Sequence, residues 1–502
     1  MASYISMGTY DASVRIPEFK GLMQYGDGIN TDPRYAVECR NLETPGGVLQ
    51  PVAAHAVLAP TLPNPIETLA VLHRRWYTGG DEKDILIAAS GQKLYAMLPS
   101  AAEWTELAYP SELAGYKYKS NVWSFVSYEI NPEGSPAPVD VLLLSNAQDG
   151  MVMVRGDTMT VSAVSTPKKF GVITRYAERI WGGAIPDDPD MLVYSSPYDP
   201  TNWEANTGLP EDGAGDVQQP SWDGDSFTAL CPFGSQLIAF TRTRAWRILG
   251  TDPGEYTFKE QYGGGASCPA TIAVDAERIF MLTERGVAVY DGLSVMPFQQ
   301  EYAKGIFDRI NRDALQQATA CLWRGSYYCA LPLDGSSVNN AVLIYNTTDG
   351  TWLMRDDLQI ESFLPTEERL YFTSAVTPGR VSVWQTDCWE AGAATAAQTR
   401  WVSPWMDLQR KEIQKGGFNI YVLCEVRDAP VTLSISVQTE KKTKTKQYTV
   451  QPVTGSERGQ KQKRLHFGGA GRRFRLIIES PSGGPAWRLV SGILVVAEID
   501  TD

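Results

Sequence analysis

The sequence has few residues that could bind a metal or form a nucleophilic catalytic pair. It contains three histidines, His55, His73 and His466, and no Gly-x-Ser-x-Gly segment that would make a nucleophile elbow. The seven cysteines include no Cys-x-x-Cys pair, whereas a zinc site needs clustered Cys or His ligands. Most cysteines lie in apolar segments, so we expect buried free thiols that pack as small hydrophobic residues. They are Cys39, Cys231, Cys268, Cys321, Cys329, Cys388 and Cys424.

Long apolar runs are also missing. No stretch of about 18 apolar residues occurs, so the sequence predicts no segment that spans a bilayer. The first residues, Met1 to Tyr4, are not a basic head followed by an apolar run, so no secretory signal is predicted. We therefore expect a chain that is made in a cytoplasm and stays there unless lysis or another route releases it.

Amphipathic helical patterns are nearly absent. Only residues 301–318 place apolar side chains at helical spacing, which predicts one surface helix inserted between strands. The 14 Trp and 23 Tyr suit sheets, where flat rings pack on pleated surfaces. The 44 Gly and 31 Pro suit the turns that many short strands require. The predicted class is therefore all-β.

One module recurs along the chain. A short apolar strand ends in a turn, a second strand follows, and a Gly-rich or aromatic break closes the unit. The later copies begin about 45 residues apart, a period typical of propeller blades. Tyr345 and Trp352 are spaced as in kelch blades and predict a strand–turn–strand at the outer edge of a blade. The copies occupy residues 84–97, 140–156, 171–183, 227–250, 271–292, 321–345 and 361–384.

These patterns predict three regions. Residues 1–75 are an N-terminal β segment that closes or flanks the propeller, residues 76–399 are a β-propeller of six to seven blades, and residues 400–502 are an antiparallel β-sandwich, since their strands alternate polar and apolar residues. The aromatic residues of the blade strands should be buried. They are Trp181, Trp246, Phe280, Tyr290 and Trp384.

Charge divides the chain at the same place. Residues 400–502 carry a net charge of +7 and the rest carries −20. An acidic body argues against tight wrapping of nucleic acid, because binding to phosphates needs a basic surface. The basic run in the sandwich predicts a long hairpin or loop, which is either solvated, a contact to an acidic neighbouring subunit, or a contact to DNA. Its residues are Lys441, Lys442, Lys444, Lys446, Lys461, Lys463 and Arg464.

Few segments suggest chemistry. Asp187 to Asp190, Asp212 to Asp216 and Trp222 to Asp225 are acidic loops that could bind Ca²⁺, although solvated turns are the commoner use of such loops. Gly263 to Gly265 is not followed by the Lys-Ser/Thr of a phosphate loop, so we expect a bend with close backbone approach. Asp349 to Trp352 resembles the Asp-box of sialidase-type propellers, but it occurs once and with different spacing. We therefore predict no catalytic residue, no cofactor and no metal, and expect that the chain is not an enzyme.

Several phrases occur in a recognisable succession. They are residues 40–49 (RNLETPGGVL), 176–181 (YAERIW), 188–190 (DPD), 193–195 (VYS), 199–203 (DPTNW), 237–242 (LIAFTR), 246–252 (WRILGTD) and 286–292 (GVAVYDG). Together, over roughly residues 35–410, the chain resembles the tail hub or packaged-DNA stabilisation proteins of short-tailed phages, and the related propeller-containing tail nozzle proteins.

The resemblance implies a structural protein of the virion tail, assembled in the host cytoplasm. It implies a homo-oligomeric ring, a hexamer, below the portal and its adaptor, with other tail proteins as partners. Such a ring extends the DNA channel and helps to retain the genome until ejection, while DNA passes without sequence-specific binding. The alternative is a carbohydrate-binding or carbohydrate-degrading propeller, such as a receptor-binding module. A cytoplasmic protein-interaction propeller is a further alternative.

Overall fold

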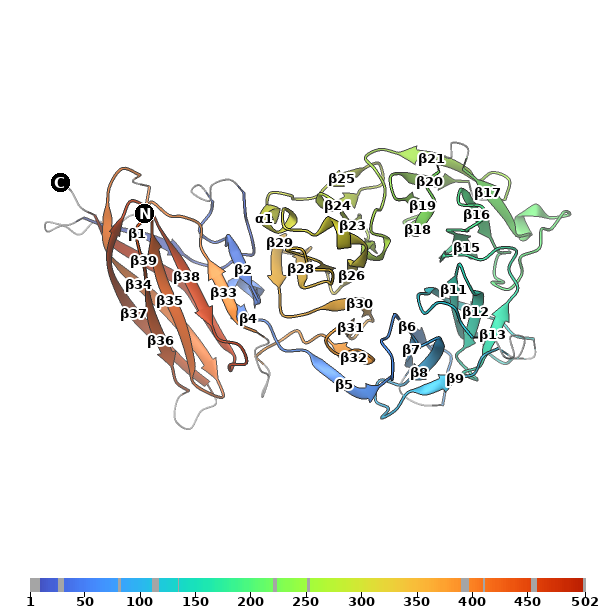
Figure 1. Cartoon of the computed structure of the whole chain (residues 1–502), viewed down its shortest axis with the longest axis horizontal. Helices are drawn as coiled ribbons and strands as arrows, with labels where there is room; N and C mark the ends of the chain where they lie inside the picture. The colour runs from blue at the N-terminus through green and yellow to red at the C-terminus, as the bar shows by residue number, and fades with distance from the viewer. Residues whose placement is uncertain are drawn as a thin grey trace.

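The fold consists of a ring of β-blades joined to a β-sandwich (Figure 1). A computed structural model of the chain describes residues 10–25, 31–79, 83–110, 117–133, 135–219, 224–250, 253–389, 397–409, 411–452 and 458–499. Strands make up 52% and helices 4% of the described residues, so the predicted all-β class is confirmed.

Seven four-stranded antiparallel blades form the propeller within the described residues. Each of the seven predicted sequence modules falls in one blade. Blades 1 to 3 contain β6 (Thr68–His73), β7 (Asp84–Ser90), β8 (Lys93–Met97) and β9 (Thr105–Leu107); β10 (Ser124–Ile130), β11 (Val139–Asn146), β12 (Gly150–Arg155) and β13 (Val161–Val164); and β14 (Val172–Tyr176), β15 (Arg179–Gly183), β16 (Met191–Tyr194) and β17 (Gly215–Gln218).

The remaining blades continue in the same order around the ring. Blades 4 to 7 contain β18 (Phe227–Phe233), β19 (Gln236–Thr241), β20 (Ala245–Leu249) and β21 (Thr257–Gln261); β22 (Ala273–Val274), β23 (Ile279–Thr283), β24 (Gly286–Tyr290) and β25 (Val295–Pro297); β26 (Thr319–Trp323), β27 (Ser326–Leu331), β28 (Ala341–Asn346) and β29 (Thr351–Arg355); and β30 (Ile360–Pro365), β31 (Leu370–Ser374), β32 (Arg380–Val383) and β5 (Ala56–Thr61).

The strand β5 closes the ring. It precedes the first blade in sequence but pairs with β32 as the outermost strand of blade 7. Backbone hydrogen bonds within blade 7 therefore hold the segment that leads into blade 1, and the ring cannot open at this point without breaking them. Residues 56–61 of the N-terminal region thus supply the last strand of the last blade.

Apolar clusters lie between adjacent blades. Between blades 3 and 4, Trp181 packs on Tyr194 with ring centroids 4.9 Å apart, and Trp246 belongs to the same cluster. Equivalent clusters separate the other pairs of blades. Because both faces of a blade meet a neighbour, its inner strands are buried on both sides. The predicted burial of Trp181, Trp246, Phe280, Tyr290 and Trp384 is confirmed.

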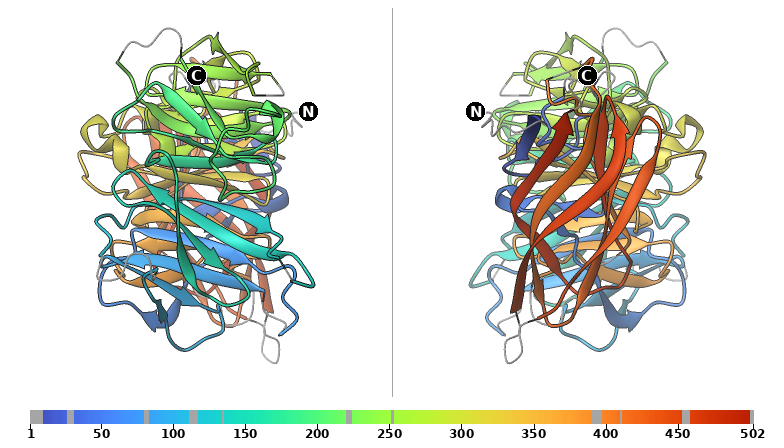
Figure 2. Two further views of the ribbon diagram at one scale, coloured as in Figure 1. Left: turned by 90° about the vertical axis from the view of Figure 1, so that its right-hand side faces the viewer. Right: turned by 90° about the vertical axis from the view of Figure 1, so that its left-hand side faces the viewer.

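The sandwich packs one sheet against another (Figure 2, right). Along its strands, side chains that point into the interior alternate with side chains that face solvent, as expected for a sheet with one covered face. The first sheet has the order β1 (Tyr10–Ile16), β39 (Trp487–Ile499), β34 (Lys415–Arg427) and β37 (Arg458–Gly471). The second has the order β2 (Glu38–Arg40), β33 (Thr399–Val402), β38 (Phe474–Ser480), β35 (Val431–Thr439) and β36 (Thr443–Val450).

The two parts share one sheet. The strand β2 pairs with β29 of blade 6 on one side, through Arg40 and Met354, and with β33 on the other. Blade 6 and the second sandwich sheet thereby form one continuous sheet of nine strands. One apolar cluster also runs from Phe280 and Trp352 in the propeller to Trp401 and Phe418 in the sandwich. The connection is therefore a packed interface and not a linker.

The N-terminal region differs from its predicted outline. Residues 10–16 and 38–40 belong to the sandwich, where β1 pairs with β39 and β2 pairs with β33. The first blade begins at Thr68, within the predicted N-terminal segment, and β33 begins at Thr399, beside the predicted boundary of the sandwich. A short ribbon of β3 (Leu42–Glu43) and β4 (Gln50–Pro51) follows β2. Pairing between strands more than 400 residues apart leaves no local pattern in the sequence.

The predicted surface helix at 301–318 is wrong. Only one helical turn, α1 (Lys304–Phe307), and a 3₁₀ helix, η5 (Arg312–Gln317), form there. Ile306, Phe307 and Leu315 are buried in the large cluster at the junction, so packing and not helix length determines the segment. Three shorter 3₁₀ turns each begin with proline, which suits a first helical position. They are η1 (Pro45–Gly47), η3 (Pro210–Asp212) and η4 (Pro269–Thr271). None of the helices among the described residues is long and apolar enough to cross a bilayer.

Candidate functional surfaces

The predicted basic loop is mostly strand. Lys441 and Lys442 lie in the turn between β35 and β36, but Lys444 and Lys446 lie in β36, and Lys461, Lys463 and Arg464 lie in β37. The strands β36 and β37 are the edge strands of the two sandwich sheets on one side. The first four residues therefore lie in the long β35–β36 hairpin, one of the two predicted forms, whereas Lys461, Lys463 and Arg464 lie in an edge strand of the other sheet. We call these seven residues the basic edge.

Two lysines of the basic edge point inward. Lys444 and Lys446 are exposed, but they lie on the same face of β36 as Tyr448 and Val450, which are buried. The Lys446 Nζ lies 5.8 Å from the centre of the Phe467 ring, and the Lys463 Nζ lies 5.9 Å from that of Tyr448. Inward-pointing charges on an edge strand oppose pairing with a further strand. Their aliphatic stems cover the open end of the core while the ammonium groups reach solvent.

The basic edge is not neutralised within the chain. None of its seven residues forms an ion pair with a residue that the structure describes. Arg464 donates from Nε to the Asn419 Oδ1 at 3.0 Å, and Lys461 donates to the carbonyl oxygen of Thr449 at 3.3 Å. Both acceptors are neutral, so the charge of this edge remains available to a partner.

A basin of about 930 Å³ lies where the first strands of blades 6, 7 and 1 end. His73 and Asp84 face each other across β6 and β7 and form a hydrogen-bonded pair at its wall. Trp323 donates from its indole N–H to the carbonyl oxygen of Thr366 at 2.8 Å, which fixes the neighbouring turn. The other charged groups that line the basin are Lys83, Arg324, Glu367, Glu368 and Arg369. Sequence reasoning missed this basin because its wall is assembled from turns of three separate blades.

A smaller cavity of about 230 Å³ lies between blade 6, the β3–β4 ribbon and residues 384–386. Trp323 and Trp384 line it, but the Arg324 guanidinium covers one ring at 4.6 Å and the Arg355 guanidinium covers the other at 4.5 Å. Arg355 is 2% exposed and pairs with Asp357 at 2.7 Å. The two rings are therefore engaged by the chain's own cations.

Glu43 lines this cavity, and among the described residues its carboxyl group has the pKa that burial raises most. Gln50 donates from Nε2 to its Oε1 at 2.5 Å, and Arg488 donates to the Gln50 Oε1 at 2.7 Å. Burial raises the pKa of the Glu43 carboxyl to about 7, against smaller opposing effects of the Gln50 hydrogen bond and the Arg355 charge. The group thus changes its charge near neutral pH at the contact between propeller and sandwich.

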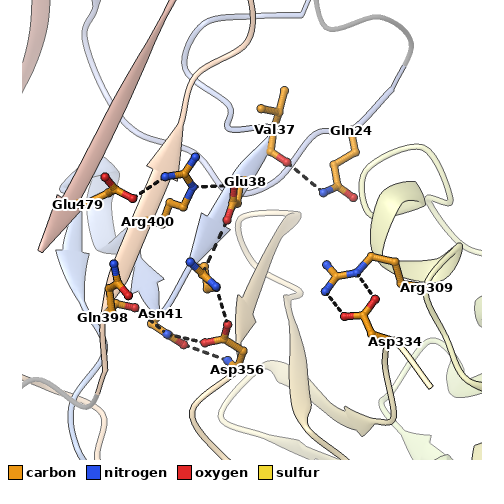
Figure 3. Close-up of polar contacts among 11 residues, drawn as sticks. Gln24, Val37, Glu38, Asn41, Arg309, Asp334, Asp356, Gln398, Arg400 and Glu479 are labelled. Atoms are coloured by element: carbon orange, nitrogen blue, oxygen red, sulfur yellow. Dashed lines mark hydrogen bonds and ion pairs between the residues drawn. The ribbon is translucent and has the colours of Figure 1, made fainter. Parts of the chain in front are cut away.

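Ion pairs connect the propeller to the sandwich (Figure 3). Arg400 of β33 pairs with Glu38 of β2 at 3.0 Å and with Glu479 of β38. On the other side of β2, Arg40 pairs with Asp356 at 3.1 Å. The buried Asn41 donates to the Asp356 Oδ1 at 2.6 Å and accepts from the Asp356 N–H at 2.9 Å. These contacts fix the short strand β2 between the two parts.

Two acids of the predicted acidic loops have partners within the chain. Asp188 pairs with Lys168 at 2.6 Å, and Asp190 accepts from the Gln218 amide at 2.9 Å. Within the ranges that the structure describes, no group of three or more His, Cys, Asp or Glu side chains is arranged to hold an ion. Trp222 and Asp223 of the third acidic loop lie outside those ranges.

Other sequence expectations can be placed directly. All seven cysteines are buried and free, and burial raises the pKa of the Cys39 and Cys231 thiols to about 12. A Cβ on Gly263 would lie 1.8 Å from the carbonyl oxygen of Val295, so this glycine allows the close backbone approach that was predicted. Tyr345 and Trp352 face each other in the outer hairpin of blade 6, with ring centroids 4.8 Å apart.

Comparisons with known proteins give only the fold. No protein-family model and no curated protein matches the sequence. Similar solved structures include the WD40 domain of Neurospora crassa Pan2 (10% identity, TM-score 0.35, 67% of this chain and 97% of that chain). They also include YCF48 from Cyanidioschyzon merolae (6%, 0.29, 66% and 99%) and PorZ, a surface component of the type-IX secretion system of Porphyromonas gingivalis (11%, 0.33, 69% and 42%). The strand topology, and not these scores, identifies the propeller.

Proposed function

We propose that the chain is a structural component of a bacteriophage virion tail, a hub or nozzle ring that lies below the portal and its adaptor. There it extends the DNA channel and helps to retain packaged DNA until ejection. The observation that carries the proposal is the sheet β29–β2–β33, which joins the propeller and the sandwich into one elongated body. A wall element of a channel needs such a connection, because repeated copies must hold one orientation.

The position of the resembling phrases supports the same proposal. Residues 176–181 cross the turn from β14 to β15, residues 246–252 begin in β20, and residues 286–292 cover β24. The phrases thus follow one another around blades 3 to 5. The order of the phrases in the sequence is therefore the order of the blades in the ring. This agrees with a propeller shared with the proteins that the chain resembles.

The lining of the basin supports a scaffold more than a catalyst. His73 is oriented by Asp84, as a general base would be. However, among the described residues no Ser, Thr or Cys side chain hydrogen-bonds to His73, and the Thr366 hydroxyl donates to the carbonyl oxygen of Arg369 at 2.9 Å. A nucleophile next to its base is therefore not assembled there.

The negative charge of the propeller region supports a channel through which DNA passes without binding to the wall. Residues 1–399 carry −20, and an acidic surface repels phosphates. A channel wall that bound DNA tightly would slow ejection. We therefore propose that part of the acidic excess faces the channel and that the basic edge faces protein.

Cryo-electron microscopy of tailed particles tests this function. Particles that contain the chain should show a ring below the portal whose density fits the propeller and the sandwich. Particles made without it should lose their packaged DNA, and the wild-type gene supplied in trans should restore retention. If purified wild-type particles do not contain the chain, the proposal is refuted.

The two tryptophans of the smaller cavity do not favour the carbohydrate-binding alternative. Sugar recognition uses open aromatic faces, yet the rings of Trp323 and Trp384 are covered by Arg324 and Arg355. A glycan array with the purified protein checks this directly. Selective binding to a glycan would revive the alternative.

A further inference from the structure

The strongest charge feature outside the basic edge lies in blade 3. Residues 180–241 contain ten Asp and Glu and no Lys, Arg or His. Most of these acids lie in the loops beside β16 and in β17, the outermost strand of the blade. Six are exposed and form no ion pair with a residue that the structure describes. We call them the acidic rim: Asp187, Asp199, Glu204, Glu211, Asp212 and Asp216.

Two exposed apolar side chains lie within the same loop. Tyr198 is 74% exposed and Leu209 is 52% exposed, although both are large hydrophobic residues. Exposed aromatic side chains among charges are typical anchors of protein interfaces. The rim therefore combines unpaired carboxylates with apolar groups that water solvates poorly.

The loop that carries the rim is held in place. The Tyr198 N–H donates to the carbonyl oxygen of Glu178 at 2.9 Å. The buried Arg179 guanidinium donates to the carbonyl oxygens of Ser195 at 2.7 Å and Gly213 at 2.5 Å. These contacts join the two ends of the loop to the start of β15. The acids are thus presented on a fixed surface, which lowers the entropy lost on binding.

The acidic rim and the basic edge lie at opposite ends of the molecule. Blade 3, with β15, β16 and β17, lies at the end of the long axis away from the sandwich, as Figure 1 and the left view of Figure 2 show. Residues 441–475, which include the basic edge, carry eleven Lys and Arg against one acidic residue. The two surfaces cannot meet within one chain, because the propeller separates them.

We infer that the basic edge of one copy binds the acidic rim of a second copy, head to tail. The inference rests on the proposed function for its setting, an assembled structural protein, and names the contact between its copies. Because the two patches differ, the contact is heterologous and leaves a free patch at each end for a further copy. Complementary potentials give such a contact its register and its partner.

The physics of exposed charges shapes the expected behaviour. Each exposed pair contributes little by itself, so several pairs and the burial of Tyr198 and Leu209 must act together. The Debye length is about 8 Å at physiological ionic strength, so added salt should weaken the contact strongly. Nucleic acid is the other polyanion that a lysine-rich edge can bind, and the experiment below separates the two partners.

Sedimentation velocity over a concentration series, at low and at high salt, measures the association. The edge variant carries Lys441→Glu, Lys442→Glu, Lys444→Glu and Lys446→Glu. The rim variant carries Glu204→Lys, Glu211→Lys, Asp212→Lys and Asp216→Lys. Each should raise the dissociation constant at least tenfold at low salt. A chain with both sets should associate again, to within a few-fold of the wild type, because the reversed surfaces attract.

Controls separate charge from folding. A matched variant reverses four exposed cations elsewhere, Lys117, Lys259, Arg285 and Lys304, and should associate as the wild type does. Since Lys444 and Lys446 also cover the end of the core, a second edge variant reverses only Lys441, Lys442 and Arg464, and should weaken association while melting as the wild type does. Thermal melts of every variant check the fold.

Four results would overturn the inference. The first three are a wild-type chain that stays monomeric at low salt, an edge variant that associates like the matched control, and a double reversal that does not restore association. The fourth is a single-stranded oligonucleotide that binds the basic edge without changing the dissociation constant of self-association. If the chain is found in tails but either reversal has no effect, the contact is refuted and the proposed function stands. If the reversals act as expected but purified tails lack the chain, the proposed function fails and the contact stands.

Discussion

The propeller and the sandwich bury their strands in different ways. In blade 2 the eight residues of β11 are all buried, because both faces meet neighbouring blades. In the sandwich, β34 buries Ile420, Val422 and Cys424 and leaves Tyr421 and Leu423 half-exposed. A continuous apolar run therefore marks a strand with two covered faces, whereas alternation marks a strand with one.

The two parts also differ in how their charge is placed. The propeller concentrates unpaired acids on the rim of blade 3, and the sandwich concentrates unpaired cations on its edge strands. Between them, at the junction, opposite charges are paired through Glu38, Arg400 and Asp356. Paired charges thus fix the parts of one chain, and unpaired charges are left for a partner.

The largest expected effect is on the propeller core. Trp181 is fully buried between blades 3 and 4, so Trp181→Ala should lower the free energy of unfolding by about 3–5 kcal/mol, as large aromatic truncations in cores do. Trp487→Ala in the sandwich is the matched truncation and should cost a similar amount, because the difference in strand pattern does not change how tightly a ring is packed. Denaturant unfolding measures both. A loss under about 0.5 kcal/mol for Trp181 would mean that the ring is not part of a packed core.

The next effect concerns pH at the junction. Because the Glu43 pKa is about 7 in the folded chain and about 4.3 in an unfolded one, folding takes up a proton between these values. The free energy of unfolding should therefore fall as pH rises from about 4.3 to about 7, by on the order of 3 kcal/mol. Glu43→Gln should remove the part of this pH dependence that comes from Glu43. The free energy of unfolding of the variant, relative to that of the wild type, should therefore increase with pH.

Thermal melts of the wild type and Glu43→Gln from pH 4 to pH 8 provide the measurement. Only the difference between the two chains isolates Glu43, because other groups also titrate. Glu425→Gln, which replaces a carboxyl in the sandwich, is the control. A constant difference across the range would show that Glu43 ionises normally.

The fold was more accessible from the sequence than the surfaces were. Seven apolar modules predicted the blades, because each blade is a local unit with its own strands and turns. Nothing local indicated that Tyr10–Ile16 pairs with β39 or that β2 continues blade 6. The basic run was predicted as a long hairpin or loop, because Lys and Gln are polar and Lys is depleted in strands, yet the lysines of β36 fit an open sandwich edge.

The acidic rim was visible in part. Ten acids without a basic residue over residues 180–241 can be counted in the sequence. Their position at the end away from the sandwich depends on the order of blades and on the pairing of β5 with β32, which the sequence does not show. Likewise, the basin at His73 needs three blades to be placed in a ring before its lining can be recognised.

A smaller effect should separate the junction pairs from ordinary surface pairs. Asp356→Ala leaves the buried Asn41 amide without its carboxylate acceptor, so a loss of about 1–3 kcal/mol is expected. Arg309→Ala removes an exposed pair with Asp334, also shown in Figure 3, and should cost about 1 kcal/mol or less. Calorimetry should also show the Asp356 variant melting in two steps, as the sandwich separates from the propeller. Equal losses and a single transition in both variants would contradict a special role for this contact.

The smallest effect on stability is expected at the basic edge, where the change appears in solubility instead. Lys444→Val with Lys446→Val places apolar side chains on the inner face of an edge strand, beside Tyr448. The free energy of unfolding should change by less than about 1 kcal/mol, because the lysine stems already cover this end of the core. Loss of the inward charges should nevertheless allow β36 to pair with other copies, so light scattering on incubation should rise. Lys441→Val with Lys442→Val removes the same number of charges from the turn and should stay clear. Equal scattering from the two variants would mean that total charge, and not the inward position of Lys444 and Lys446, keeps the edge soluble.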